Sequence, residues 1–254
     1  HYPLRRQRQM CIRDRSTLKN EITKLPSDNE PIVVGNFRRE VGHSIFDYYL
    51  RRFAGVDQTN GDPQYYMTNE TTGALDITND FTEADRVLVG KEAIPDVFGG
   101  FGVNLEAGNF SLGLQFSYQL GGYGLDTEYF SLLGINQQVS NIVDYDKTWT
   151  VDNPTASLPR VDPLVNNQYV TTDLYLVDQS FLSLNNINLG YVLQNEAIKK
   201  YHIDSIRLYG TMNNAFLLYS ARQGYDPRLS VSGRSAGEYG ANRTIAFGVN
   251  INLN

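Results

Sequence analysis

The chain has 254 residues, a formal net charge of −6 and a mean hydropathy of −0.37. The net negative charge argues against a nucleic-acid partner, because phosphate binding requires clustered Lys and Arg. No run of about eighteen apolar residues is present, so no transmembrane helix is expected. The low hydropathy still allows a membrane β-barrel, because barrel strands alternate apolar and polar residues.

The first residues differ from the rest of the chain. The sequence opens with His1 rather than Met, and residues 9–15, QMCIRDR, resemble translated sequencing-adapter DNA. We expect residues 1–15 to be a non-native, adapter-derived tail that is not part of the fold; a real basic tail is the alternative. Residues 16–254 then form one unit, which has no disulfide chemistry because Cys11 is the single cysteine.

Period-two alternation predicts strands along the remaining chain. A weak strand is expected from Thr17 to Leu25, and a second around Phe46, Tyr48 and Leu50, with His43, Asp47 and Arg51 on its polar face. The clearest segments alternate without a charge on their apolar face, as lipid exposure requires. They are residues 97–107, 110–120, 187–193, 206–213 and 245–253.

The connections between these strands alternate in length. Gly108 and Asn109 make a tight turn, and about one turn of helix separates Leu193 from Ile206. The other connections leave roughly 40, 60 and 28 residues, which is long for a compact soluble domain. Short turns at one end and long loops at the other are typical of outer-membrane barrels. We therefore expect long extracellular loops, short periplasmic turns and a C-terminus on the periplasmic side.

About seven strands are expected, which is an odd number and too few to close such a barrel alone. The sequence therefore predicts an all-β chain that is an antiparallel, transmembrane portion of a larger barrel. Outer-membrane lipid would contact its apolar face.

Several sequence segments resemble motifs of the SusC/RagA family of TonB-linked outer-membrane transporters. They include GVDQTNGDPQYY from Gly55, DRVLVGKEAIPDVFGGFG from Asp85, SFLSLNNINLGYVL from Ser180, GYDP from Gly224 and NRTIAFGVNINL from Asn242. The resemblance runs in order and at matching spacing from about residue 16 to the end. It departs at Gln194, where the family usually has Pro, and at Asn254, where it ends in an aromatic residue.

That resemblance implies the C-terminal part of a 22-strand barrel, in a protein that imports oligosaccharides or peptides. It further implies a SusD-like surface lipoprotein as partner, and TonB acting through a plug and TonB box upstream of this chain. A structural or adhesive surface barrel without active uptake is the alternative function. A soluble β-sandwich is a third possibility, since it would show similar alternation.

No catalytic constellation is recognisable, so an enzyme is not expected, and neither is a cofactor. Asp76, Asp80, Glu83 and Asp85 form an acidic cluster in a long connection. They lack the spacing of a calcium loop, and a solvated loop face is the favoured interpretation.

Substrate contact is the remaining question for single residues. Sugars are gripped by aromatic platforms and polar side chains, which loops and the barrel lumen can present. The alternative for each ring is packing between loops or against the lipoprotein. The candidates are Trp149, Tyr129, Tyr145, Tyr169, Tyr175, Tyr225 and Tyr239 in loops, and Asp47, Arg51, Gln115 and Gln119, with Asn104, as lumen lining.

Overall fold

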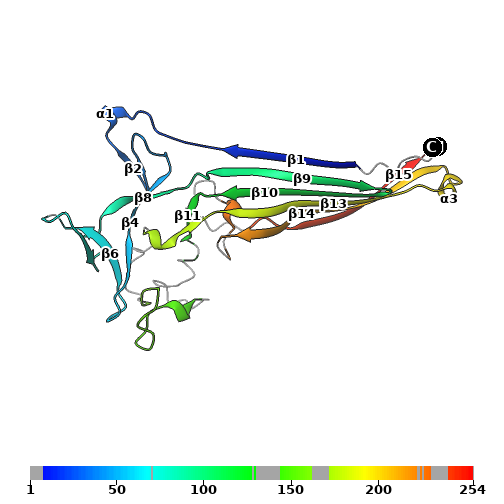
Figure 1. Cartoon of the computed structure of the whole chain (residues 1–254). Coiled ribbons are helices and arrows are strands. Elements are labelled where there is room, and N and C mark those ends of the chain that lie inside the picture. Colours follow the sequence, from blue (N-terminus) through cyan, green and yellow to red (C-terminus); the bar gives the residue numbers. More distant parts are fainter. Residues whose placement is uncertain are drawn as a thin grey trace.

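The computed structural model describes residues 8–69, 71–127, 129, 144–161, 172–221, 224, 226–229 and 240–253. Its main element is one six-stranded sheet in which every pair of neighbours is antiparallel. The sheet is long, and the smaller elements gather at one of its ends (Figure 1). In spatial order its strands are β1 (Arg8–Thr17), β9 (Val97–Ala107), β10 (Phe110–Leu120), β13 (Phe181–Leu193), β14 (Ile203–Ser220) and β15 (Thr244–Leu253).

The all-β, antiparallel prediction is confirmed, and the short connections lie where the sequence placed them. Gly108, at φ +62°, makes the turn between β9 and β10. The helix α3 (Glu196–Lys199) joins β13 to β14, and the Asn195 side chain caps it by accepting from the Ile198 amide. None of the helices in the described part of the chain is long and apolar enough to span a membrane.

Two bulges keep the faces of the sheet uniform. Ile187 pairs with Leu114, and Leu184 pairs with Phe116, so Asn185 is an extra residue between them. If Asn185 were paired regularly instead of bulged, the pleat would turn Leu184 to the polar face, because side chains alternate with a period of two. A matching irregularity in β14 brings Phe216 opposite Leu184.

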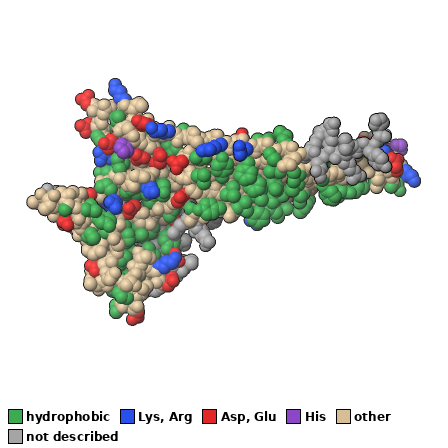
Figure 2. Space-filling model, in the orientation of Figure 1, with side chains coloured by type: hydrophobic (Ala, Val, Ile, Leu, Met, Phe, Trp, Pro, Cys, Tyr) green, Lys and Arg blue, Asp and Glu red, His purple; other side chains and the backbone are tan. Residues whose placement is uncertain are grey.

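The apolar face of the sheet is not covered by any of the residues that the structure describes. Phe247 is 84% exposed, Phe110 65% and Leu189 57%. Figure 2 shows a continuous hydrophobic area along the sheet, while charged side chains gather over the smaller elements. Each Å² of apolar surface left in water costs about 25 cal/mol, so this face is suited to lipid rather than to solvent.

The buried core lies beyond the sheet, among small sheets built from its long connections. Tyr48, Leu50, Tyr65, Leu125 and Tyr175 are nearly inaccessible and form one cluster. One sheet has β2 (Ile32–Val34), β3 (Phe37–Arg39), β4 (Asp47–Arg51) and β8 (Arg86–Glu92); a second has β5 (Phe53–Val56), β6 (Pro63–Thr68) and β7 (Leu75–Thr78). A third pairs β11 (Tyr123–Leu125) with β12 (Leu176–Asp178), and the short helices are α1 (Pro26–Asn29), η1 (Tyr145–Lys147), η3 (Asp173–Tyr175) and η4 (Pro227–Leu229).

Two expected strands of the main sheet differ from the structure. The strand around Phe46 to Leu50 exists as β4, but Tyr48 and Leu50 face the buried cluster instead of lipid. The strand expected from Thr17 to Leu25 is wrong beyond Thr17. That segment is irregular, and its Asn20 side chain accepts from the Ile45 amide at 2.9 Å.

β1 covers much of the expected tail and extends to Thr17, and its apolar and polar faces are inverted relative to the rest of the sheet. Arg13 pairs with Phe101, which places the guanidinium on the apolar face of the sheet. Met10 and Ile12 pair with Asn104 and Gly102 and therefore lie on the polar face. The prediction that residues 1–15 are not native stays a proposal, which this inversion supports.

Exchanging the arginines of β1 for apolar residues should stabilise the folded sheet in a bilayer. We expect Arg13→Leu with Arg15→Val to raise the free energy of unfolding from lipid vesicles. The gain should be up to about 2–4 kcal/mol per arginine and smaller near the interface. Urea titration followed by tryptophan fluorescence measures it. Arg207→Leu on the polar face is the control, and an equal gain there would contradict the assignment of faces.

Candidate functional site

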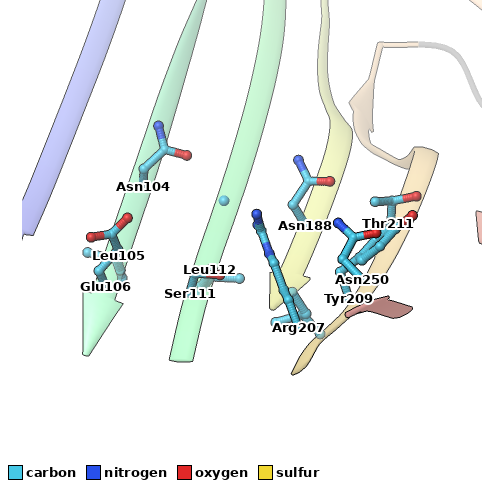
Figure 3. A pocket seen from close by; sticks show the side chains of 12 residues that line it. Asn104, Leu105, Glu106, Ser111, Leu112, Asn188, Arg207, Tyr209, Thr211 and Asn250 are labelled. Atoms are coloured by element: carbon cyan, nitrogen blue, oxygen red, sulfur yellow. The ribbon is translucent and has the colours of Figure 1, made fainter. Parts of the chain in front are cut away.

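The polar face of the sheet carries a hollow of about 420 Å³. It lies over five strands, β9, β10, β13, β14 and β15, and its polar side chains stand on one common face (Figure 3). Its polar lining is Asn104, Glu106, Ser111, Asn188, Arg207, Tyr209, Thr211 and Asn250. We call this set the polar wall.

Glycines let the side chains of the polar wall lie flat. A Cβ at Gly248 would overlap the Tyr209 ring, so the ring occupies the space above that glycine. A Cβ at Gly113 would press on the Asn104 amide oxygen at 2.9 Å. Flat side chains present their edges along the wall and leave the space in front of it open.

Hydrogen bonds hold part of this surface in place. The Asn186 amide donates to Asn213 Oδ1 at 2.6 Å, and the Asn188 amide donates to Asn186 Oδ1. One cation and one carboxylate, Arg207 and Glu106, accompany the amides and hydroxyls. Such a surface can bind hydroxyl-rich or peptide-like groups by hydrogen bonds, without a strong preference for either charge.

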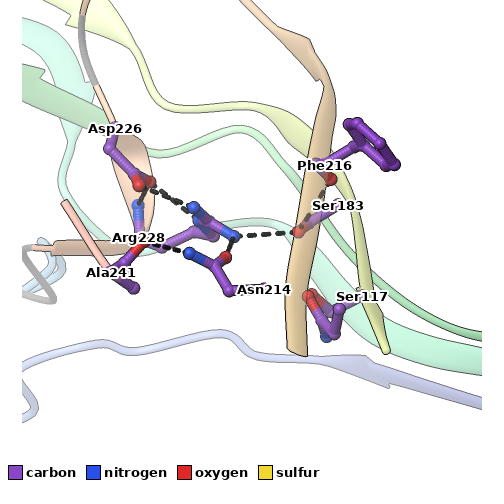
Figure 4. Close-up of polar contacts among 8 residues, drawn as sticks. Ser117, Ser183, Asn214, Phe216, Asp226, Arg228 and Ala241 are labelled. Carbon is purple, nitrogen blue, oxygen red and sulfur yellow. Dashed lines mark hydrogen bonds and ion pairs between the residues drawn. The ribbon is translucent and has the colours of Figure 1, made fainter. Parts of the chain in front are cut away.

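A second polar cluster fixes the turn after β14 to the sheet. Arg228 donates to both carboxylate oxygens of Asp226, at 2.8 and 2.7 Å. Its Nη1 donates to Ser183 Oγ at 2.9 Å and to Asn214 Oδ1 at 2.7 Å, as Figure 4 shows. Asn214 in turn donates to the Ala241 carbonyl. We call these residues the loop anchor, because they join the turn to β13 and β14.

Removing the guanidinium fork should release this turn from the sheet. We expect Arg228→Met to raise the hydrogen-exchange rates of the backbone amides in 226–229 by roughly tenfold or more, because bonds to charged groups are worth about 1.5–3 kcal/mol. Exchange followed by mass spectrometry measures this. Arg228→Lys keeps the charge but loses the bidentate geometry, so full protection in that variant would count against the anchor.

The loop anchor should also weaken in acid. The hydrogen bond from Arg228 holds the pKa of Asp226 below its ordinary value. The contribution is therefore complete above the usual aspartate pKa of about 3.9, and it is lost as the pH falls through the lower pKa of the folded state. A pH titration of the Arg228 Nε–H signal by NMR should show this transition. Asp226→Asn should abolish it, and a transition that persisted in that variant would belong to another group.

Of the loop aromatics, Trp149 packs against the turn that contains Gly61. A Cβ at Gly61 would overlap the indole ring, and the indole N–H donates to the Gln58 carbonyl at 3.2 Å. Arg160 and Asp62 form an ion pair beside it at 3.0 Å. This position favours the packing alternative for Trp149.

Tyr129 and Tyr175 lie together in the loop core. Tyr175 is 3% exposed, so its ring presents almost no surface to a ligand. Tyr129 is half-buried with its ring centre 6.4 Å from that of Tyr175, and its hydroxyl donates to Asp144 Oδ2 at 2.6 Å. Tyr145 begins the helix η1, and its side chain lies outside the described part of the structure. Tyr169, Tyr225 and Tyr239 lie outside the described residues altogether.

The four lumen candidates divide between two places. Gln115 is exposed on the polar face of β10, and Gln119 on the same face donates to the Gly121 carbonyl at 3.4 Å. Asp47 and Arg51 lie instead on β4, among the loops. Asp47 accepts from His43 at 2.9 Å, and Arg51 stacks on Phe81 at 4.2 Å.

The acidic cluster of the long connection holds its own backbone. Asp80 Oδ1 accepts from the Thr82 amide at 2.8 Å, and Glu83 accepts from the Thr78 hydroxyl at 2.9 Å. The Asn69 side chain donates to Asp76 at 2.8 Å. These bonds agree with a solvated loop face.

Sequence reasoning did not nominate Arg207, Tyr209, Asn188 and Asn250, although it placed them on polar strand faces. The local pattern does not give the pairing of the strands or their register, which brings these four side chains onto one surface. Arg228 was also missed. Its neighbour Pro227 was noticed as part of GYDP, but only the structure shows that the turn bends back onto β13.

Comparison with known proteins shows what the chain is similar to. Two curated relatives come from Formosa agariphila. TonB-dependent receptor P3 is 27% identical over 92% of this chain and 25% of its own length, and TonB-dependent receptor P39 is 26% identical over 59% and 15%. No family model matches the chain.

Solved structures agree on the fold. The RagAB peptide transporter superposes with a TM-score of 0.78 over 99% of this chain and 28% of that one, at 21% identity. The RagAB peptide importer in its closed-closed state gives 0.79. The chain therefore resembles a SusC/RagA-like TonB-dependent transporter and spans about a quarter of the curated relative P3. The likeness indicates the outer membrane, and these relatives are receptors and transporters rather than enzymes.

Proposed function

We propose that residues 16–254 form the C-terminal barrel segment of a TonB-dependent outer-membrane importer of oligosaccharides or peptides. One observation carries the proposal: a single antiparallel sheet leaves an apolar face uncovered and carries hydrogen-bonding groups on the other. A wall with lipid on one side and water on the other needs this division. The similarity to TonB-dependent receptors supports import as the purpose of the wall.

The proposal includes an orientation and two partners. The turns at Gly108 and at α3 face the periplasm, together with the C-terminus, and the small sheets face outside. A SusD-like lipoprotein covers the outside end. Exposed apolar residues there, such as Val33 and Val34, give it a surface for contact. TonB acts through a part of the protein other than this chain.

A structural or adhesive surface barrel is the second candidate. The packed core among the loops is compatible with adhesion, because adhesion is served by a rigid outer structure. The polar wall favours import, since adhesion needs no hydrogen-bonding surface inside a barrel.

Growth of a deletion strain tests the import proposal. Deleting the coding region of residues 97–253 should abolish or slow growth on one class of nutrient in a panel of glycans and peptides. Energy from TonB is required for import, so a strain without TonB should show the same loss. The intact gene should restore growth in the deletion strain. Unchanged growth on every nutrient would contradict import and leave the adhesive function.

A further inference from the structure

A cavity of about 440 Å³ lies between β8 and the sheet formed by β6 and β7, apart from the polar wall. Its lining brings together charges of both signs and an apolar surface. Arg52, Asp85 and Asp173 supply the charges, while Leu75, Leu88 and Val89 are among its apolar residues.

Both carboxylates accept hydrogen bonds from backbone amides. Asp173 accepts from the Phe53 amide at 2.8 Å through Oδ1, and Asp85 accepts from the Thr68 amide at 2.6 Å through Oδ2. A carboxylate has two acceptor oxygens, so each side chain can accept a further hydrogen bond from a ligand. Burial raises the pKa of Asp173 against the opposing effect of the Phe53 amide. A cation bound beside it would stabilise the ionised form.

The guanidinium of Arg52 lies over an aromatic ring. It stacks over the Tyr66 ring at 4.8 Å from the ring centre, and the side chain is exposed. Within the described part of the chain, Arg52 forms no ion pair with Asp85, Asp173 or any other acid. The charge of Arg52 lowers the pKa of Asp173 without a direct ion pair between them, so both groups can also contact a ligand that carries both charges.

The apolar part of the lining has an open rim. Leu75 is 58% exposed at the cavity, and Leu88 and Val89 are half-buried. An apolar group seated there would remove this surface from water. The single aromatic ring in the lining, Tyr66, is already covered on one face by Arg52, which makes it a poor stacking platform for a sugar.

We propose that this cavity binds a short peptide with a free amino terminus and an apolar side chain. Asp173 and Asp85 accept hydrogen bonds from its ammonium, Arg52 binds its carboxylate, and Leu75 and Leu88 contact the side chain. This inference rests on the proposed import function and selects peptides over oligosaccharides as the cargo that the outside end recognises.

Calorimetric titration of the purified whole protein that contains this chain, in detergent, tests the cavity, with the dipeptide Leu-Leu as probe. We expect Leu-Leu to bind, maltotriose not to bind, and N-acetyl-Leu-Leu and Leu-Leu-amide each to bind at least about tenfold more weakly, because each lacks one charge. Asp173→Asn and Arg52→Gln should each weaken Leu-Leu by a similar factor. Asp152→Asn, an exposed carboxylate elsewhere in the loops, should leave the affinity unchanged.

Combining each variant with each modified ligand shows which side chain contacts which charge of the peptide. Asp173→Asn should not weaken N-acetyl-Leu-Leu further, because the ammonium it serves is already absent. Circular dichroism must show strand content equal to the parent chain for each variant. Absence of Leu-Leu binding by the folded parent, or equal binding of the acetylated and free forms, overturns the cavity proposal. Loss of growth in the deletion strain alongside either result would leave import intact, so the two failures are distinguishable.

Discussion

The structure depends on the requirement that backbone polar groups be satisfied by hydrogen bonds within the sheet itself. In a bilayer no water is available to them, and an antiparallel sheet supplies the partners strand by strand. This pairing is continuous from β1 to β15. Once the backbone is paired, the apolar side chains can stay uncovered by protein. The exposure of Phe247 and Phe110 is therefore expected of a sheet whose apolar face contacts lipid.

The same requirement explains why the core lies elsewhere. The long connections leave the membrane zone and meet water, so they must bury their own apolar side chains. They do so around Tyr48, Leu50 and Tyr65, in small sheets that pack against one another. Two solvents thus produce two kinds of order in one chain: exposed apolar faces in the sheet, and a water-excluded core among the loops.

The sequence predicted the sheet well where a strand has lipid on one face and water on the other. Residues 110–120 alternate without exception, and they form β10 with the expected bounds. Alternation does not say what covers the apolar face, so it cannot distinguish the buried Tyr48 and Leu50 from residues that face lipid. Register and long-range contacts are set by pairing between distant segments. The polar wall and the bonds from Arg228 to Ser183 and Asn214 therefore could not be foreseen from local pattern.

The loop anchor has a consequence for the order in which the sheet assembles. The connection from β14 to β15 is long, and the entropy of closing a loop rises with its length. Arg228 and Asp226 tie an intermediate point of this connection to β13 and β14, which are already paired with each other. The remaining free chain before Thr244 is shorter, so β15 searches a smaller volume for its register. The loop anchor should therefore speed the pairing of β15 with β14, although none of its residues belongs to β15.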